Sequence, residues 1–144
     1  MVSCTTNTNN LNVDNNIGPI SQIVIQPTSY CNLRCHYCYL SISERQSKNL
    51  MPESMPADII NFALKSGYAN SKLELRWHAG EPLSVGINFF EKAISQINSI
   101  LPKNYQLTHT IQTNGTYINQ GWCDFFKKYD FKVGVSIDGP AFIH

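Results

Sequence analysis

Three closely spaced cysteines carry the most specific chemistry in this sequence. Cys31, Cys35 and Cys38 lie within the run CNLRCHYC, whereas Cys4 and Cys123 stand apart from it. A short loop with this spacing can wrap one face of an iron–sulfur cube, because each thiolate then binds a different iron. The fourth iron would have no protein ligand, which would leave one position open for a substrate or a cofactor.

Two other interpretations of the cysteines stay open at this point. A structural zinc site requires four ligands, so His36 or His78 would have to join the three thiolates. The cysteines would otherwise be unligated and packed, although inert buried thiols rarely cluster so closely. A total of five cysteines does not suit a secreted disulfide framework, and we expect metal or redox chemistry in a reducing compartment. Cys123 lies among aromatic residues, and we expect it to be packed in the core.

Composition narrows the class of protein. The chain has 144 residues, of which 42% are hydrophobic, and this suits one domain or part of one. A formal net charge of +1 gives no broad field for nucleic acid or anionic lipid, and no apolar run approaches the roughly 20 residues of a membrane span. No secretory signal is visible, so we expect a cytoplasmic protein without nucleic-acid or membrane partners. Residues 1–18 are rich in Asn, and we expect a disordered leader before a folded part at 19–144.

Strand patterns alternate with helix patterns along the rest of the chain. Strands are expected at residues 20–26, 72–78, 106–113 and 132–138, and helices at 54–68, 88–101 and 119–129. We expect Ser54, Asn88 and Asn119 to cap the three helices. This order predicts an α/β fold in which the four strands form a parallel sheet with right-handed crossovers.

Polar motifs follow the ends of the later strands. Gly80 and Glu81 come after the second predicted strand, Asn114 follows the third, and Ser136 and Asp138 close the fourth. The carboxyl ends of parallel strands meet at one edge of a sheet, and this edge is where such folds place their sites. We therefore expect these residues and the cysteine loop to form one site.

The same motifs resemble those of a known family. The cysteine run has the pattern Cys-x3-Cys-x-aromatic-Cys, with Tyr37 at the aromatic position, which is the hallmark of the radical S-adenosylmethionine (SAM) superfamily. The segments WHAGEPL (77–83), QTNGT (112–116) and VSIDGP (135–140) are similar to the next three signature segments of that superfamily, in the same order. The sequences of these segments resemble those of the branch with a Cys-rich carboxyl-terminal extension (SPASM). This branch includes anaerobic sulfatase-maturating enzymes and cyclophane-forming peptide maturases. One departure is Ala79, where the family usually has glycine.

The resemblance implies a fold and a cofactor chemistry. Such enzymes resemble partial (β/α)6 barrels, so the chain would supply the first four strands, as the amino-terminal part of the core domain. Cys31, Cys35 and Cys38 would ligate a [4Fe-4S] cluster, and SAM would chelate its open iron. An electron from a donor such as flavodoxin or ferredoxin would then split SAM into methionine and a 5′-deoxyadenosyl radical.

Roles for the other motif residues follow from the same resemblance. Tyr37 would offer its backbone to the adenine of SAM. Gly80 and Glu81 would hold the methionine ammonium through a carbonyl or carboxylate acceptor. Contacts to the ribose or the carboxylate of SAM would come from Asn114, Ser136 and Asp138.

The resemblance finally implies an enzyme that starts hydrogen abstraction from a peptide or protein substrate. We expect maturation of a ribosomal peptide; sulfatase maturation and a non-catalytic Cys3His zinc module are the alternatives. His36 and His109 are expected to be structural or to support a neighbouring ligand, and not to be catalytic. We interpret the chain as an amino-terminal fragment that exposes a parallel edge at its fourth strand, and we expect it to aggregate or stay partly molten when expressed alone.

Overall fold

The sheet is parallel throughout. The computed structural model describes residues 19–140 and 142, and the leader predicted at 1–18 lies outside the described residues. Four strands pair in the order β1-β2-β3-β4, each parallel to its neighbour. They are β1 (Ile20–Ile25), β2 (Ala69–Trp77), β3 (Gln106–Thr113) and β4 (Lys132–Val135). The predicted α/β class with one parallel sheet is confirmed.

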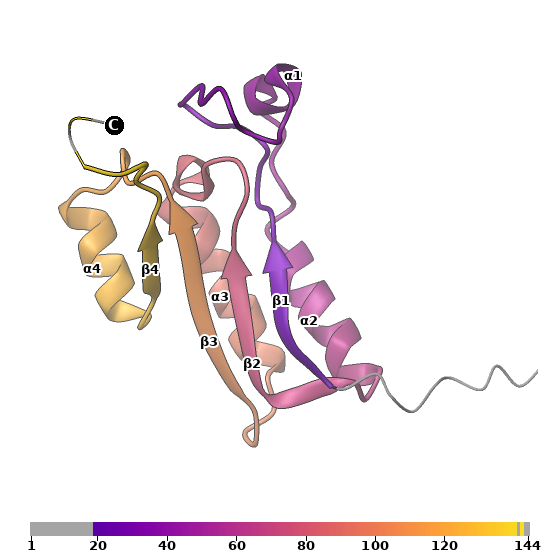
Figure 1. The fold of residues 1–144 in the computed structure, drawn as a ribbon. Helices are drawn as coiled ribbons and strands as arrows, with labels where there is room; N and C mark the ends of the chain where they lie inside the picture. Colours follow the sequence, from indigo (N-terminus) through magenta and orange to yellow (C-terminus); the bar gives the residue numbers. More distant parts are fainter. Residues whose placement is uncertain (1–18, 141, 143–144) are drawn as a thin grey trace, which may run out of the picture.

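Three helices cover one face of this sheet, and the other face stays open (Figure 1). They are α2 (Met55–Lys65), α3 (Ile87–Ile100) and α4 (Gln120–Lys128). The alternation of β2 explains the two faces, because Leu73, Leu75 and Trp77 are buried against the helices. Glu74 and Arg76, which lie between them, face the open side. Within the described part of the chain, no helix is both long and apolar enough to cross a lipid bilayer.

An aromatic cluster fills the core between the sheet and the helices. Trp77 is fully buried, and its ring meets that of Phe90 on α3 edge to face, with 5.0 Å between the ring centres. Phe90 in turn contacts Trp122 and Phe125 of α4 at 5.7 and 5.8 Å. Each such ring contributes roughly 1.5–3 kcal/mol when it is fully buried, so this cluster holds α3 and α4 on the sheet.

A buried histidine belongs to the same cluster. The ring of His109 stacks on that of Phe131 at 5.0 Å, and its Nδ1 accepts a hydrogen bond of 3.4 Å from Trp77 Nε1. Burial lowers the pKa of His109 to about 4, because the charged imidazolium would lose its hydration there. His109 is therefore a neutral core residue, which agrees with the structural role expected from the sequence.

The starts of the three helices agree only in part with the predicted caps. Asn119 caps α4, since its side chain accepts a 3.1 Å hydrogen bond from the backbone N–H of the third helical residue. Ser54 precedes α2 but makes no side-chain capping bond, and Pro56 in the first turn has no N–H to satisfy. The prediction that Asn88 caps α3 is wrong, because Gly86, at φ +83°, turns the chain so that the helix begins before Asn88.

Two short helical segments were not predicted. The first, α1 (Ile42–Gln46), follows the cysteine run and begins with a capping box between Ser41 and Glu44. Hydrogen bonds from Ser41 lower the pKa of the Glu44 carboxyl. The second is a 3-10 helix, η1 (Pro82–Val85), directly after the motif that follows β2. Both segments lie next to residues that the sequence assigned to the site.

The fourth strand is shorter than predicted. β4 ends at Val135, which pairs with Thr113, the last residue of β3. One more backbone hydrogen bond follows, from Ser136 N to Thr113 O at 2.9 Å. Beyond this point β3 offers no further residues for pairing, so Asp138 belongs to the rim of the sheet.

The prediction that Cys123 is packed in the core is wrong. Its side chain is exposed on α4, whereas Trp122, Phe125 and Phe126 are buried. Four neighbouring helix positions cannot all face inward, because successive residues are rotated by about 100° around the helix axis. The three aromatic residues occupy the inward positions, and the cysteine faces out.

The open face of the sheet is polar. Glu74 Oε1 accepts hydrogen bonds from Arg76 Nε at 3.0 Å and from Thr110 Oγ1 at 2.8 Å. The bond from Thr110 is the main reason why the pKa of Glu74 is lowered. Lys132 pairs in register with Thr110 and lies on the same face. A sheet buried on both faces would carry apolar residues at these positions, so this face is not packed core.

Candidate functional site

The cysteine loop lies above the carboxyl end of β1, beside the ends of the other strands (Figure 1). Backbone hydrogen bonds hold its beginning: Glu81 N donates to Tyr30 O at 2.7 Å, and Cys31 N donates to Arg45 O at 3.0 Å. The side chain of Arg45 also donates to Cys35 O at 3.1 Å. The end of β2 therefore holds the loop on one side, and α1 holds it on the other.

All three cysteines of the run border one cavity. Its volume is about 220 Å³, and Cys31, Cys35 and Cys38 are half-buried and free. Tyr37 and other loop residues line it from one side. The strand ends supply the remaining lining, which is His78, Ala79, Gly80, Gln112, Thr113, Asn114 and Ser136. Of the residues that the sequence grouped into one site, Glu81 and Asp138 do not line this cavity.

The three thiols of the cysteine run border a common space. Within residues 19–140 and 142, no three side chains of Cys, His, Asp or Glu gather closely enough to hold one metal ion, as a zinc site requires. In a cubane each thiolate binds a separate iron, so the sulfurs must surround a space. The cavity shared by the three thiols supplies such a space.

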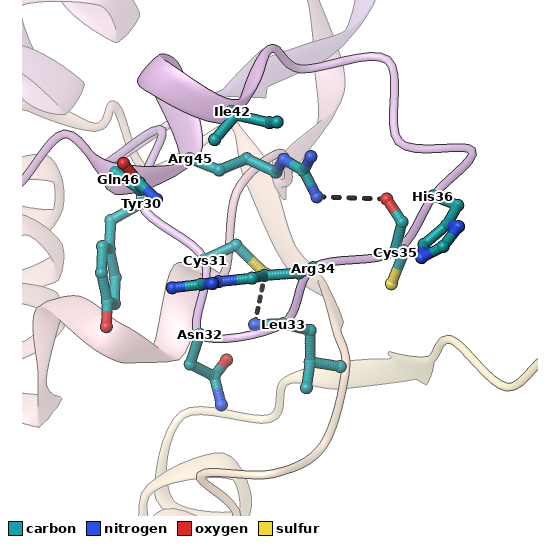
Figure 2. A pocket seen from close by; sticks show the side chains of 10 residues that line it. All are labelled: Tyr30, Cys31, Asn32, Leu33, Arg34, Cys35, His36, Ile42, Arg45 and Gln46. Carbon is teal, nitrogen blue, oxygen red and sulfur yellow. Dashed lines mark hydrogen bonds between the residues drawn. The ribbon is translucent and has the colours of Figure 1, made fainter.

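A second cavity, of about 480 Å³, lies on the α1 side of the loop (Figure 2). Figure 2 shows Arg45 reaching from α1 to the carbonyl oxygen of Cys35. The sulfur of Cys31 accepts a hydrogen bond from Leu33 N at 3.4 Å. Cys31, Leu33 and Cys35 line both cavities, so the loop forms the wall between them. Arg45 was not predicted as a site residue, because no sequence pattern links it to the cysteine run.

Glu81 joins two strand ends from inside the protein. Its carboxylate is fully buried, and Oε1 accepts hydrogen bonds from Leu83 N at 3.0 Å and from Thr113 Oγ1 at 2.6 Å. Oε2 accepts a hydrogen bond from Asn114 N at 2.8 Å. Both oxygens are therefore engaged within the chain. The sequence offered two kinds of acceptor for an ammonium group, a backbone carbonyl and a carboxylate. Gly80 lines the cavity with its backbone, whereas the Glu81 carboxylate does not line it.

The turn that follows β2 requires glycine at one position. Gly80 has φ +59°, and a Cβ at this residue would lie 2.6 Å from Thr28 O and 2.7 Å from Tyr30 O. Ala79 has φ +73°, a left-handed conformation that costs an L residue about 1 kcal/mol or more. The strained backbone at Ala79 gives a physical reason for the glycine that the family usually has there.

Side chains also connect the fourth strand to the site. Tyr37 Oη donates a 2.5 Å hydrogen bond to Asp138 Oδ1, and this bond raises the pKa of Tyr37 above its ordinary value. Gln112 Nε2 donates to Ser136 Oγ at 2.8 Å. A Cβ at Gly134 would overlap the Gln112 side chain, so glycine there leaves room for Gln112 to reach across β4. Gln112 is thus a lining residue that the sequence analysis did not assign.

A ring of hydrogen bonds joins the cysteine loop to the turn after β3. Asn32 Nδ2 donates to Thr116 Oγ1 at 2.8 Å, and Thr116 Oγ1 donates to Asn114 Oδ1 at 2.6 Å. Asn114 Nδ2 closes the ring by donating to Asn32 Oδ1 at 2.9 Å, and it lies 3.8 Å from Cys31 Sγ. The contacts from Asn32 and Cys31 to the turn join residues 82 to 84 positions apart, so no local sequence pattern indicates them.

Fold and site together define a class of protein. A parallel α/β sheet holds a loop of three free thiols at its carboxyl edge, next to a cavity lined by the strand ends. This arrangement is that of an α/β domain built to bind a thiolate-ligated cofactor. Residues 25–142 match the radical SAM superfamily, and the chain belongs to this superfamily. The resemblance inferred from the motifs is confirmed at this level.

Individual relatives agree with the family. The chain is 46% identical over 133 residues to the uncharacterized protein sll1766 of Synechocystis, covering 90% of this chain and 33% of the relative. It is 34% identical over 129 residues to the cysteine-type anaerobic sulfatase-maturating enzyme of Clostridium novyi, covering 87% and 34%. The solved structure of native anSMEcpe with bound AdoMet and Kp18Cys peptide superimposes with a TM-score of 0.76 at 33% identity, covering 88% and 34%. The chain thus spans about a third of the length of these relatives.

Proposed function

We propose that this chain is the SAM-cleaving part of a radical SAM enzyme that starts hydrogen abstraction from a peptide or protein substrate. The observation that carries the proposal is the cavity that Cys31, Cys35 and Cys38 border together with the strand ends. We assign the three cysteines to a [4Fe-4S] cluster and the strand ends to SAM. When both are bound, they supply a 5′-deoxyadenosyl radical. Residues 19–144 would form the amino-terminal part of the core domain.

The strand ends offer distinct groups for the parts of SAM. The Gly80 backbone is suited to the methionine ammonium, and the Tyr37 backbone to the adenine, since both residues line the cavity. Ser136 Oγ accepts from Gln112 Nε2, so its own hydrogen can be donated to a ribose or carboxylate oxygen of SAM. One oxygen of Asp138 accepts from Tyr37, and its other oxygen can accept from a ribose hydroxyl.

The same side chains restrict access to the cavity. A primary carbon radical attacks most C–H bonds, so the chain must keep out water and fix one target hydrogen in reach. The bond between Tyr37 and Asp138 joins the loop to the residues after β4, and the ring through Asn114 joins it to the turn after β3. We propose that these two links hold the loop over the cavity while a substrate is bound.

Two substrate types fall within this proposal. The amino-acid sequences of the motifs resemble those of peptide maturases, which supports maturation of a ribosomal peptide. The relatives support sulfatase maturation as the second candidate, because both a cysteine-type and a serine-type sulfatase-maturating enzyme match, at 34% and 32% identity. Incubation of the full-length protein with a sulfatase-derived peptide, and separately with a precursor peptide encoded next to it, distinguishes the two by the mass change of the product.

The test of the cofactor site is anaerobic reconstitution of the full-length protein with iron and sulfide. We expect a bound cluster and dithionite-dependent formation of 5′-deoxyadenosine. Cys35→Ser should lose most of the bound iron and sulfide, whereas Cys123→Ser, a matched change on the exposed face of α4, should keep both. Stoichiometric zinc without sulfide, or equal losses in the two variants, would contradict the assignment of the cysteine run.

A further inference from the structure

We infer that Asn114 is a positioning residue for the cluster ligand Cys31. The side-chain amide of Asn114 donates a hydrogen bond to the sulfur of Cys31, and this bond makes the bound cluster easier to reduce. The inference rests on the proposed function, since it requires the cluster. It differs from the SAM contact that the resemblance suggests for Asn114. The reason is that both ends of this amide already have partners within the chain.

The sulfur of Cys31 lies within reach of two N–H donors. Leu33 N lies 3.4 Å from Cys31 Sγ, and Asn114 Nδ2 lies 3.8 Å from it. These distances suit hydrogen bonds to sulfur, which is larger than oxygen and accepts over longer separations. The first donor comes from the loop itself, whereas the second comes from the turn after β3 and is 83 positions away in the sequence.

The orientation of the Asn114 amide is fixed by its other partners. Its Oδ1 accepts from both the backbone N–H of Thr116, at 3.0 Å, and the Thr116 hydroxyl, at 2.6 Å. A flipped amide would turn its NH2 group toward a backbone N–H that can only donate, so the flip is unfavourable. Asn32 Oδ1 holds Nδ2 from the other side. The NH2 group therefore faces the loop and the sulfur.

The backbone of Asn114 is held as firmly as its side chain. Asn114 N donates to the buried carboxylate of Glu81 at 2.8 Å. A hydrogen bond to a charged acceptor is stronger than one between neutral groups, so this contact fixes the start of the turn. A continuous path of hydrogen bonds thus runs from the buried end of the site, through Asn114, to one ligand of the cluster.

Hydrogen bonds to the sulfurs of an iron–sulfur cluster affect its reduction potential. Reduction adds negative charge that spreads onto the thiolates, and an N–H donor stabilises this charge. Loss of the Asn114 donor should therefore disfavour the reduced state. At a fixed potential we expect the ratio of reduced to oxidised cluster to fall about threefold, the effect of one weak charge-assisted bond.

The experiment is a redox titration of the full-length reconstituted protein, followed by electron paramagnetic resonance without SAM. The variants are Asn114→Ala, which removes the donor, and Thr116→Val, which breaks the same ring but keeps the Asn114 amide. Asn32→Ala serves as a second test of the donor, because it removes the acceptor that holds Nδ2. We expect a shift to lower potential in Asn114→Ala, a smaller shift in Asn32→Ala and little change in Thr116→Val.

Each outcome of this experiment supports or overturns the role inferred for Asn114, or refutes the proposed function. An unchanged potential in Asn114→Ala with full iron and sulfide content overturns the inference. If Asn114→Ala fails to hold the cluster while Thr116→Val holds it fully, the positioning role is supported; equal loss in both overturns it, because the ring would then serve the fold alone. Absence of iron and sulfide from the wild-type protein would instead refute the proposed function.

Discussion

Replacement of the buried carboxylate tests the geometry of the rim most directly. In Glu81→Gln the side chain keeps its size but has only one acceptor oxygen. The backbone N–H groups of Leu83 and Asn114 bond to different oxygens of Glu81, so one of them would face an NH2 group in the variant. Loss of a bond to a charged acceptor, together with a buried donor left unsatisfied, costs about 3 kcal/mol of unfolding free energy. The turn that carries Asn114 should also loosen.

The assay is urea unfolding of the full-length protein followed by circular dichroism, with Glu91→Gln as the matched control. Glu91 forms an exposed ion pair with Lys128, so its loss should change the unfolding free energy by less than about 1 kcal/mol. We expect a clear separation of the two variants. If Glu81→Gln unfolds within about 0.5 kcal/mol of the wild type, the buried bonds do not hold the rim together and the reasoning fails.

Three further predictions concern the backbone and the core. Gly80→Ala should lower the unfolding free energy by more than about 2 kcal/mol, because the added Cβ would meet two carbonyl oxygens. The control is Gly67→Ala, at φ +75° in open space, which should lower it by about 1 kcal/mol in the same urea assay. Ala79→Gly should gain about 0.5 kcal/mol, since relief of the φ +73° conformation exceeds the added freedom of the unfolded chain; a loss would contradict this. The pKa of His109 is about 4 when folded and 6.5 when unfolded, so in this window the unfolded chain binds the extra proton. Stability should fall by up to about 3 kcal/mol as the pH drops from 6.5 to 4, and His109→Phe should flatten that profile.

Periodic patterns of apolar residues predicted most of the helices and strands. The strand expected at residues 106–113 has those bounds in the structure, and each end of α3 lies within one residue of the helix expected at 88–101. Such patterns work because a buried face repeats at the period of its element. The five-residue helix α1 is too short to show a repeat. Its capping box, Ser41 with Glu44, was the one readable signal and was missed.

The site was predictable at the level of strand ends but not of side-chain direction. The rule that parallel strands share one functional edge correctly grouped Gly80, Asn114 and Ser136 around the cysteine loop. The rule does not say which way a side chain points. Glu81 turns inward because Leu83 N and Thr113 Oγ1 converge on it from two elements, and only the folded chain brings these donors together.

The strict two-residue alternation of β2 fixes the pairing register of the sheet. A slip of one residue would place Glu74 and Arg76 among the aromatic rings and would move Leu75 and Trp77 into water. Burial of two charged side chains costs several kcal/mol even when they pair with each other, so misaligned pairings are strongly disfavoured. The contrast between the two faces of one strand therefore sets the height along the sheet at which Gly80 meets the cysteine loop.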